Sequence, residues 1–281
     1  MQSPIGSTRT AAVIGNPVRH SLSPPIHNAA FQALDLDWVY VAFDVGPGQA
    51  HKALDAMRTL HLGGLSVTMP HKADIAAAVD RLTPEASLLG AVNCVAWEQG
   101  ELVGHNTDGE GFVASLEAET GRSVRDQRCV VLGAGGAARA VILALGQAGA
   151  SDVAVINRTS EKAVVAAALA GPVGRVGKLG DVAGADIVVN ATSVGMAGTP
   201  TAGMSPIAEE MLSDDQVVAD LIYHPLATPL LQSAERRRAT AIGGVGMLVH
   251  QAARQFELWT THAAPLAVMH EAAGRAIGAN Q

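Results

Sequence analysis

The chain has 281 residues, of which 48% are hydrophobic and 16% are charged, and its formal net charge is −7. This composition excludes a disordered or fibrous chain, and a negative balance without a basic stripe argues against a nucleic-acid-binding surface. The length fits two medium-sized domains or one large α/β unit.

Two cysteines, Cys94 and Cys129, lack paired spacing, so we expect no disulfide framework and no zinc site. No cluster of His, Cys and carboxylate residues has metal-ligand spacing, so we expect no other bound metal. Residues 1–10 lack the apolar core of a signal peptide, and no apolar run reaches membrane-spanning length. We therefore predict a cytoplasmic protein without membrane or nucleic-acid partners.

Runs rich in Val and Ile alternate with stretches rich in Ala and Leu, which predicts an α/β fold with βα units around a parallel sheet. The first part of the chain has strands predicted at 11–15, 38–45 and 64–70 and helices at 24–34, 50–60 and 72–80. Residues 91–108 contain two short strand-like runs around Gln99-Gly100, which predicts an antiparallel hairpin.

A predicted helix at 109–119 leads into the polar stretch 120–128, where a second sheet is expected to begin. From Cys129 the alternation restarts, with strands predicted at 129–132, 152–158, 186–192 and 216–223. Residues 243–260 are predicted to close the chain as one long helix.

The strongest motif is "VVLGAGGAARA", in which Gly133, Gly135 and Ala138 match G-x-G-x-x-G/A between a buried strand and a helix. The first glycine permits a tight turn, and the second lets the backbone approach a pyrophosphate at the helix N-terminus. An ordinary glycine turn is the alternative, but the flanking strand and helix favour dinucleotide binding.

The next strand indicates which dinucleotide binds. A NAD site usually has Asp or Glu at the end of this strand, to bond the ribose 2′-hydroxyl. Asn157-Arg158-Thr159 stands there instead, and an arginine fork suits a 2′-phosphate. The sequence therefore favours NADP over NAD, with an ordinary exposed arginine as the alternative.

A nicotinamide cofactor implies hydride transfer, and reducing a ketone requires a proton donor. Lys72 lies in the expected first turn of a helix, where the positive end of the helix dipole favours release of its proton. Asp108 follows the hairpin and could hold the ammonium and a substrate hydroxyl in line. The alternatives are a surface lysine, a helix N-cap at Asp108, and hydrogen-bonding neighbours at His71 and His105.

The stretch "HSLSPP" has two serines before a predicted helix, although one side-chain oxygen is enough to cap it. From the residues alone, Ser23 is predicted as the N-cap with Pro24 at the first helical position. That assignment leaves Ser21 without a role.

The blocks "GNPVRHSLSP", "VTMPHK", "GAVNC", "HNTDGEGF", "GAGGAAR", "NRT", "NATSVGM", "DLIYHPLATPLL" and "GMLVHQAARQFELW" together resemble the shikimate dehydrogenase family, in that family's order and over nearly the whole chain. The resemblance implies NADP-dependent interconversion of 3-dehydroshikimate and shikimate in aromatic amino acid biosynthesis, by a monomer or homodimer. It also implies an α/β substrate-binding domain of residues 1–107 plus 246–281, and a Rossmann domain of residues 108–245.

Site roles follow from the resemblance, with Lys72 and Asp108 as the catalytic pair. The implied substrate-binding residues are Ser21, Ser23, Thr68, Lys72, Asn93, Asp108, Tyr223 and Gln251. The implied cofactor-binding residues are Gly133, Ala134, Gly135, Gly136, Ala137, Asn157, Arg158, Thr159, Thr192, Ser193, Ile222, Gly244 and Met247.

Three positions depart from the family pattern. Ser66 stands where asparagine is common, Cys94 where threonine often follows A-V-N, and Gly243 where aspartate often precedes the late glycine. None of these changes touches the Lys72 and Asp108 pair, but they leave the preferred polyol open, so one alternative is a quinate/shikimate dehydrogenase that uses NAD or NADP. A second alternative is a ligand-sensing module without turnover, against which every proposed catalytic position is filled by a competent residue.

Overall fold

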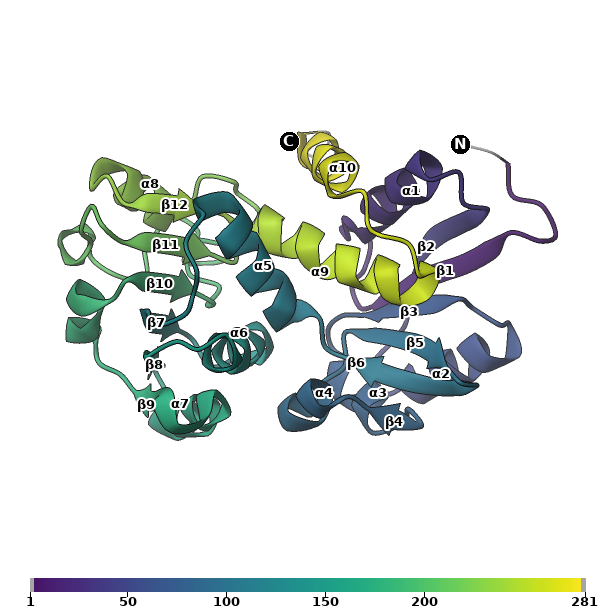
Figure 1. Cartoon of the computed structure of the whole chain (residues 1–281), viewed down its shortest axis with the longest axis horizontal. Helices are drawn as coiled ribbons and strands as arrows, with labels where there is room; N and C mark the ends of the chain where they lie inside the picture. Colours follow the sequence, from purple (N-terminus) through teal and green to yellow (C-terminus); the bar gives the residue numbers. More distant parts are fainter. Residues whose placement is uncertain (1–2, 279–281) are drawn as a thin grey trace. The chain divides into compact units, whose positions relative to one another are not determined.

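The computed structural model describes residues 3–278 and divides the chain into two compact units (Figure 1). The first unit takes in the residues up to Thr107 and those from Gln251 onward, and the second unit spans Asp108–His250. In the described part of the chain, no helix combines the length and the apolar character needed to cross a bilayer.

The first unit is built on a six-stranded mixed sheet with the strand order β2-β1-β3-β5-β6-β4. Its strands are β1 (Arg9–Gly15), β2 (Trp38–Asp44), β3 (Gly64–Val67), β4 (Arg81–Leu82), β5 (Cys94–Glu98) and β6 (Glu101–His105). The predicted hairpin is confirmed, because β5 and β6 pair antiparallel. Gln99 and Gly100 both have positive φ, 51° and 88°, as a two-residue primed turn requires.

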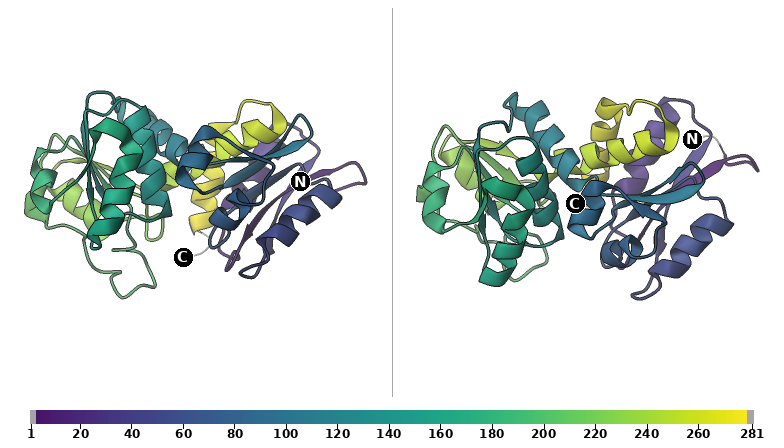
Figure 2. Two further views of the ribbon diagram at one scale, coloured as in Figure 1. Left: turned by 90° about the horizontal axis from the view of Figure 1, so that it is seen from below. Right: turned by 60° about the horizontal axis from the view of Figure 1, so that its bottom comes forward.

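Helices cover both faces of this sheet. They are α1 (Ser23–Ala33), α2 (Ala50–Thr59), α3 (Lys72–Ala76), α4 (Pro84–Leu89), the part of α9 (Gly244–Thr260) from Gln251 onward, and α10 (Leu266–Gly278). Side chains alternate along a strand, so Leu65 packs with α2, α3 and α4 while Ser66 points to the opposite face and bonds to α9. Figure 2 shows α2 in blue and the yellow helices α9 and α10 on opposite faces.

The prediction that residues 243–260 close the chain is wrong, because α10 follows α9. α10 packs against α1 (Figure 1), burying Met269, Ala272, Ala273 and Ile277. These small and apolar residues recur at the spacing of one helix face, so α10 can bury that face.

The second unit is built on a six-stranded sheet in which every strand pair is parallel. Its strands are β7 (Arg128–Leu132), β8 (Asp152–Ile156), β9 (Gly174–Val176), β10 (Ile187–Asn190), β11 (Val217–Asp220) and β12 (Thr240–Ile242). Their spatial order, β12-β11-β10-β7-β8-β9, is that of the Rossmann fold. The order reverses between β7 and β10, where such sheets bind ligands at the carboxyl ends of the strands.

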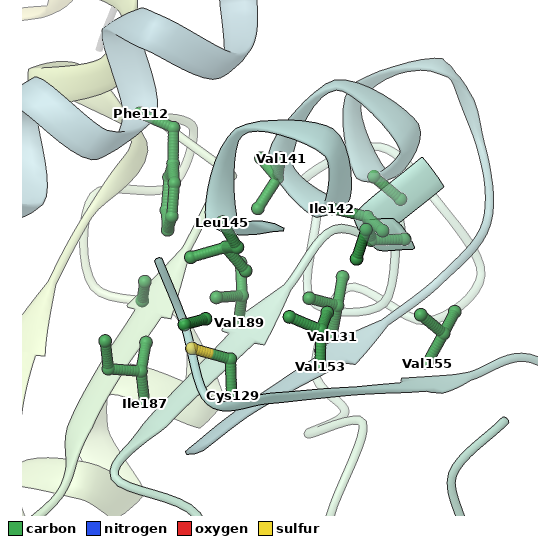
Figure 3. Packing of buried hydrophobic residues seen from close by; sticks show 14 of the residues in the cluster. Phe112, Cys129, Val131, Val141, Ile142, Leu145, Val153, Val155, Ile187 and Val189 are labelled. Atoms are coloured by element: carbon green, nitrogen blue, oxygen red, sulfur yellow. The ribbon is translucent and has the colours of Figure 1, made fainter. Parts of the chain in front are cut away.

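Helices cover both faces of this sheet as well. They are α5 (Asp108–Thr120), α6 (Gly136–Gln147), α7 (Ser160–Ala167) and α8 (Pro229–Arg236). Figure 3 shows one core layer, in which Val131, Val153 and Val189 of the strands meet Val141 and Leu145 of α6. The opposite layer packs strand side chains against α8 and residues 207–212. An α/β fold with mostly parallel sheets is therefore confirmed.

Candidate functional site

The glycine motif forms the turn from β7 into α6. Gly133 has a φ of +113°, and a Cβ there would lie 2.9 Å from the Ala191 carbonyl oxygen, so only glycine fits without strain. Gly135 is the N-cap of α6, and no side chain caps this twelve-residue helix. A Cβ at Gly135 or Gly136 would meet nothing within 4 Å. The backbone at these two glycines is therefore open on its Cβ side, and an uncapped helix N-terminus suits a pyrophosphate.

The residues after β8 form the neighbouring loop. The Asn157 amide nitrogen donates to the Thr159 carbonyl oxygen at 2.9 Å, which folds the loop on itself. Arg158 is exposed at its tip. The Gly133 N–H donates to the Ile156 carbonyl oxygen at 2.8 Å, so the glycine turn and this loop start from one edge of the sheet.

Two buried polar residues that the sequence reasoning missed end β10 and β11. The Asn190 amide nitrogen donates to Asp220 Oδ1 at 3.0 Å, and Asn190 Oδ1 accepts from the Thr192 hydroxyl at 2.7 Å. Asp220 also accepts from the Ile222 N–H at 3.1 Å and from the Thr228 hydroxyl at 2.7 Å. Burial raises the pKa of Asp220, although these hydrogen bonds oppose the shift. The sequence does contain a signal for these two residues, because a polar residue ends each apolar run, in "VVN" and in "VAD".

The start of α9 lies against the segment that follows β11. The Gly244 N–H donates to the Ile222 carbonyl oxygen at 3.2 Å, and a Cβ at Gly244 would clash with the Leu221 carbonyl group. Met247 packs partly buried against the core layer of Figure 3. Tyr223 is 38% exposed. The small residue at position 244 therefore allows a close approach of α9 to Ile222.

The prediction that Ser23 is the N-cap of α1 is wrong. The cap residue is Leu22, whose backbone is already helical, and Ser23 is the first helical residue. The Ser21 hydroxyl accepts from the Ser23 N–H at 3.3 Å, and Pro24 and Pro25 have no N–H to satisfy. Ser21 thus takes the local capping role, and Ser23 begins the helix.

Thr68 and Lys72 follow β3 on a short connection. The His71 N–H donates to the Thr68 carbonyl oxygen at 3.0 Å, and the buried His71 ring lies with Nε2 2.7 Å from the Val45 carbonyl oxygen. Lys72 is the first residue of α3, and its carbonyl oxygen accepts from the Val92 N–H at 2.9 Å. Buried His71 thus anchors the backbone on which Lys72 stands.

Asn93 and Gln251 come together in the first unit, although they are 158 positions apart. Asn93 Nδ2 lies 3.5 Å from Gln251 Oε1. Buried Thr107 joins them, because its N–H donates to Asn93 Oδ1 at 2.8 Å and its hydroxyl donates to the Gln251 carbonyl oxygen at 3.1 Å.

The two predicted catalytic residues belong to different units. Lys72 lies in the first unit, and Asp108 is the first residue of the second unit and of α5. Asp108 is buried, with 8% of its surface exposed. His105 Nε2 lies 2.9 Å from a Glu98 carboxylate oxygen, and burial lowers the His105 pKa. Within residues 3–278, no group of three or more His, Cys, Asp or Glu is placed to hold a metal.

Three family descriptions match the chain. "Shikimate dehydrogenase substrate binding domain" matches residues 13–95, "Shikimate / quinate 5-dehydrogenase" matches 115–221, and "Shikimate 5'-dehydrogenase C-terminal domain" matches 244–273. These matches cover both units.

Individual proteins are similar over almost their full length. The chain is 45% identical to a shikimate dehydrogenase (NADP(+)) of Moorella thermoacetica, covering 98% of this chain and 95% of the relative. It is 44% identical to one of Methanopyrus kandleri, covering 94% of each. The structure of the Thermus thermophilus shikimate 5-dehydrogenase, in complex with NADP(H) and shikimate, superposes with a TM-score of 0.88 at 38% identity, covering 95% of this chain and 99% of that chain. The chain therefore belongs to the shikimate dehydrogenase family.

Proposed function

We propose that the chain catalyses the reversible, NADPH-dependent reduction of 3-dehydroshikimate to shikimate. The observation that carries the proposal is the open glycine turn at the N-terminus of α6, followed after the next strand by Arg158 in place of an acidic residue. Together with the family, these features support an NADP-dependent dehydrogenase that acts on a CH–OH group.

The second unit supplies the residues for NADP. We assign the pyrophosphate to the turn formed by Gly133, Ala134, Gly135, Gly136 and Ala137. A 2′-phosphate is a dianion on an exposed rim, and the planar Arg158 guanidinium can bond it with two parallel N–H groups. Asn157 and Thr159 complete that cradle.

The nicotinamide side is assigned to five residues, Thr192, Ser193, Ile222, Gly244 and Met247. Asn190 and Asp220 accept hydrogen bonds from the N–H groups of two of them, Thr192 and Ile222. The hydrogen bonds at Asn190 and Asp220 keep this edge of the sheet rigid, so a flat ring can be oriented before reaction.

NADPH, when bound, supplies the hydride to the substrate carbonyl carbon. Lys72 delivers the proton that the resulting oxygen requires, and its ammonium group also stabilises the developing negative charge. The Asp108 carboxylate accepts a hydrogen bond from the substrate hydroxyl and so orients it. In the reverse direction, Lys72 takes the proton back.

The remaining substrate ligands suit a polyhydroxylated ring that carries a carboxylate. The hydroxyl groups of Ser21 and Ser23, at the N-terminus of α1, donate hydrogen bonds to the substrate carboxylate. Thr68, Asn93, Tyr223 and Gln251 are assigned to the ring hydroxyls or the carboxylate, because a site that bonds each hydroxyl rejects analogues that lack one.

The experiment that tests this function compares four reactions, NADP and NAD each with shikimate and with quinate, followed by absorbance of the reduced cofactor. The proposal expects the largest kcat/KM for NADP with shikimate. A larger kcat/KM with quinate or NAD would replace the substrate or cofactor assignment by the quinate/shikimate alternative. Tight NADPH binding with no turnover would support a ligand-sensing module instead.

We also propose a cytoplasmic location and a monomeric or homodimeric state. Both cysteines, Cys94 and Cys129, are buried and unpaired, as a reducing compartment allows. Fluorescent tagging with fractionation tests the location, and sedimentation velocity at several concentrations tests the oligomeric state.

A further inference from the structure

Six polar side chains of the first unit form one hydrogen-bonded group that we call the amide cluster. Its members are Tyr40, Ser66, Asn93, Thr107, Gln251 and Gln255. All except Gln251 are at least 95% buried. Gln255 lies at the centre and is bonded to members on β3, on the connection between β6 and α5, and on its own helix α9.

Fixed backbone groups set the direction of the hydrogen bonds at one end of the cluster. The Thr107 N–H, which can only donate, lies 2.8 Å from Asn93 Oδ1. The Asn93 carbonyl oxygen, which can only accept, lies 3.4 Å from Gln255 Nε2. Reversal of the Gln255 amide would place two acceptors against each other, so its nitrogen must face Asn93.

The hydrogen bonds at the other end of the cluster require the same orientation of the Gln255 amide. The Tyr40 hydroxyl donates to Ser66 Oγ at 2.5 Å, and the Ser66 hydroxyl donates to Gln255 Oε1, also at 2.5 Å. The Gln255 oxygen is therefore occupied by Ser66. Its nitrogen is left to donate to Gln251 Oε1, at 2.7 Å.

The Gln251 amide is oriented as a consequence. Its oxygen accepts from Gln255 Nε2 and lies 3.5 Å from Asn93 Nδ2. An amide whose oxygen faces two donors has its nitrogen turned away from them. Asn93 and Gln251 are two of the four residues assigned above to the ring hydroxyls or the carboxylate of the substrate.

We propose that Gln255 is a positioning residue that fixes the polarity of the Gln251 amide, so that Gln251 presents N–H donors to the substrate. Gln255 acts through Gln251. This inference rests on the proposed function, because it takes shikimate as the ligand. With the amide fixed in this way, binding is selective for a substrate that places a hydrogen-bond acceptor next to the Gln251 amide nitrogen.

The test measures the shikimate dissociation constant by isothermal titration calorimetry in a double-mutant cycle. The proteins are the wild type, Gln255→Met, Gln251→Ala and the double variant. Methionine keeps the approximate length of glutamine but has no amide. Gln255→Met is expected to raise the dissociation constant roughly tenfold in the wild-type background and less than about twofold in the Gln251→Ala background.

A second variant tests the direction of the same hydrogen bonds. Gln255→Glu preserves the side-chain shape and accepts from Ser66, but its carboxylate has no N–H for Gln251. The Gln251 amide is then expected to reverse, and the dissociation constant should rise at least as much as for Gln255→Met. If Gln255→Met does not fold, this variant takes its place in the cycle.

Gln216→Met is the matched control. Gln216 is another buried glutamine, and its amide nitrogen donates to the Val182 and Ala185 carbonyl oxygens at 2.6 and 3.0 Å, in the second unit. This variant should lose stability while keeping the wild-type affinity for shikimate. Thermal unfolding of every variant reports the stability change separately.

Two outcomes would overturn the inference. One is an unchanged dissociation constant in Gln255→Met and Gln255→Glu, and the other is an equal rise in both backgrounds, which would indicate a general structural effect. If the wild type itself bound no shikimate, the proposed function would fail rather than this inference.

Discussion

The Asn190 amide donates a 3.0 Å hydrogen bond to the Asp220 carboxylate, joining the carboxyl ends of β10 and β11. Neither residue is assigned to touch a ligand. They instead hold the backbone of Thr192 and Ile222, which belong to the proposed nicotinamide side. Buried polar pairs of this kind are worth most when every donor and acceptor is satisfied.

Asp220→Asn should therefore weaken both the fold and cofactor binding. The amide nitrogen introduced at position 220 would compete with the donors of Asn190, Ile222 and Thr228, leaving at least one buried group unpaired. We expect a loss of about 2 kcal/mol in the free energy of unfolding and a higher KM for NADP. Denaturant unfolding and steady-state kinetics measure the two effects. Exposed Asp214→Asn is the control and should change neither.

The glycine turn allows a matched pair of variants. Gly133→Ala places a Cβ 2.9 Å from the Ala191 carbonyl oxygen at a φ of +113°, so it should destabilise the fold by roughly 1–3 kcal/mol. Gly135→Ala has an ordinary extended backbone and open space around its Cβ, so stability should change by less than about 0.5 kcal/mol.

Cofactor affinity separates these two variants further. The Gly135→Ala methyl group stands where the pyrophosphate is expected to approach the backbone, so the NADPH dissociation constant should rise about tenfold or more. Fluorescence titration of NADPH measures it. Wild-type affinity in a well-folded Gly135→Ala variant would contradict the assignment of the turn to the pyrophosphate.

Sequence patterns predicted the parts of the structure that depend on near neighbours. The Gln99-Gly100 hairpin and the glycine turn each depend on a few consecutive residues. The amide cluster was not predictable in the same way, because Ser66 and Gln255 are 189 positions apart and meet only when α9 packs on the sheet. The Ser23 cap was mispredicted because Pro25 has no N–H for a cap at Ser23 to satisfy, and the Ile26 N–H donates to the Leu22 carbonyl oxygen instead.

Arg158→Ala should lower the preference for NADP over NAD. The exposed guanidinium is assigned to the 2′-phosphate, which NAD lacks, so kcat/KM with NADP should fall at least about tenfold while that with NAD stays within about twofold. Arg125→Ala, another exposed arginine of the second unit, is the control. An equal loss with both cofactors would show that Arg158 does not distinguish the two.

His27 makes the fold sensitive to acid. The ring is fully buried and stacks on Tyr40 with 4.4 Å between centroids, and neither ring nitrogen has a hydrogen-bond partner among the described residues. Burial lowers the His27 pKa from 6.5 to about 3. Between these values the unfolded chain binds more protons, so the free energy of unfolding should fall with decreasing pH by up to about 1.4 kcal/mol per pH unit.

The variant His27→Phe keeps an aromatic ring against Tyr40 and removes this titration. Its free energy of unfolding should depend less steeply on pH between 6 and 4 than that of the wild type, as measured by denaturant unfolding at each pH. Exposed His51→Gln, on α2, should leave the slope unchanged. Parallel curves for His27→Phe and the wild type would mean that another group causes the acid sensitivity.

Lys72→Met should separate binding from chemistry. Methionine keeps the apolar stem at the start of α3, and the backbone there stays held by the Val92 and His71 hydrogen bonds. Loss of the ammonium removes the proton donor, a contribution of about 10²- to 10⁴-fold in rate, so kcat should fall by that amount while the NADPH dissociation constant stays near the wild-type value. Exposed Lys52→Met, on α2, is the control and should retain full kcat. Near-normal turnover by Lys72→Met would mean that another residue is the proton donor. Asp108 would then be the next position to substitute.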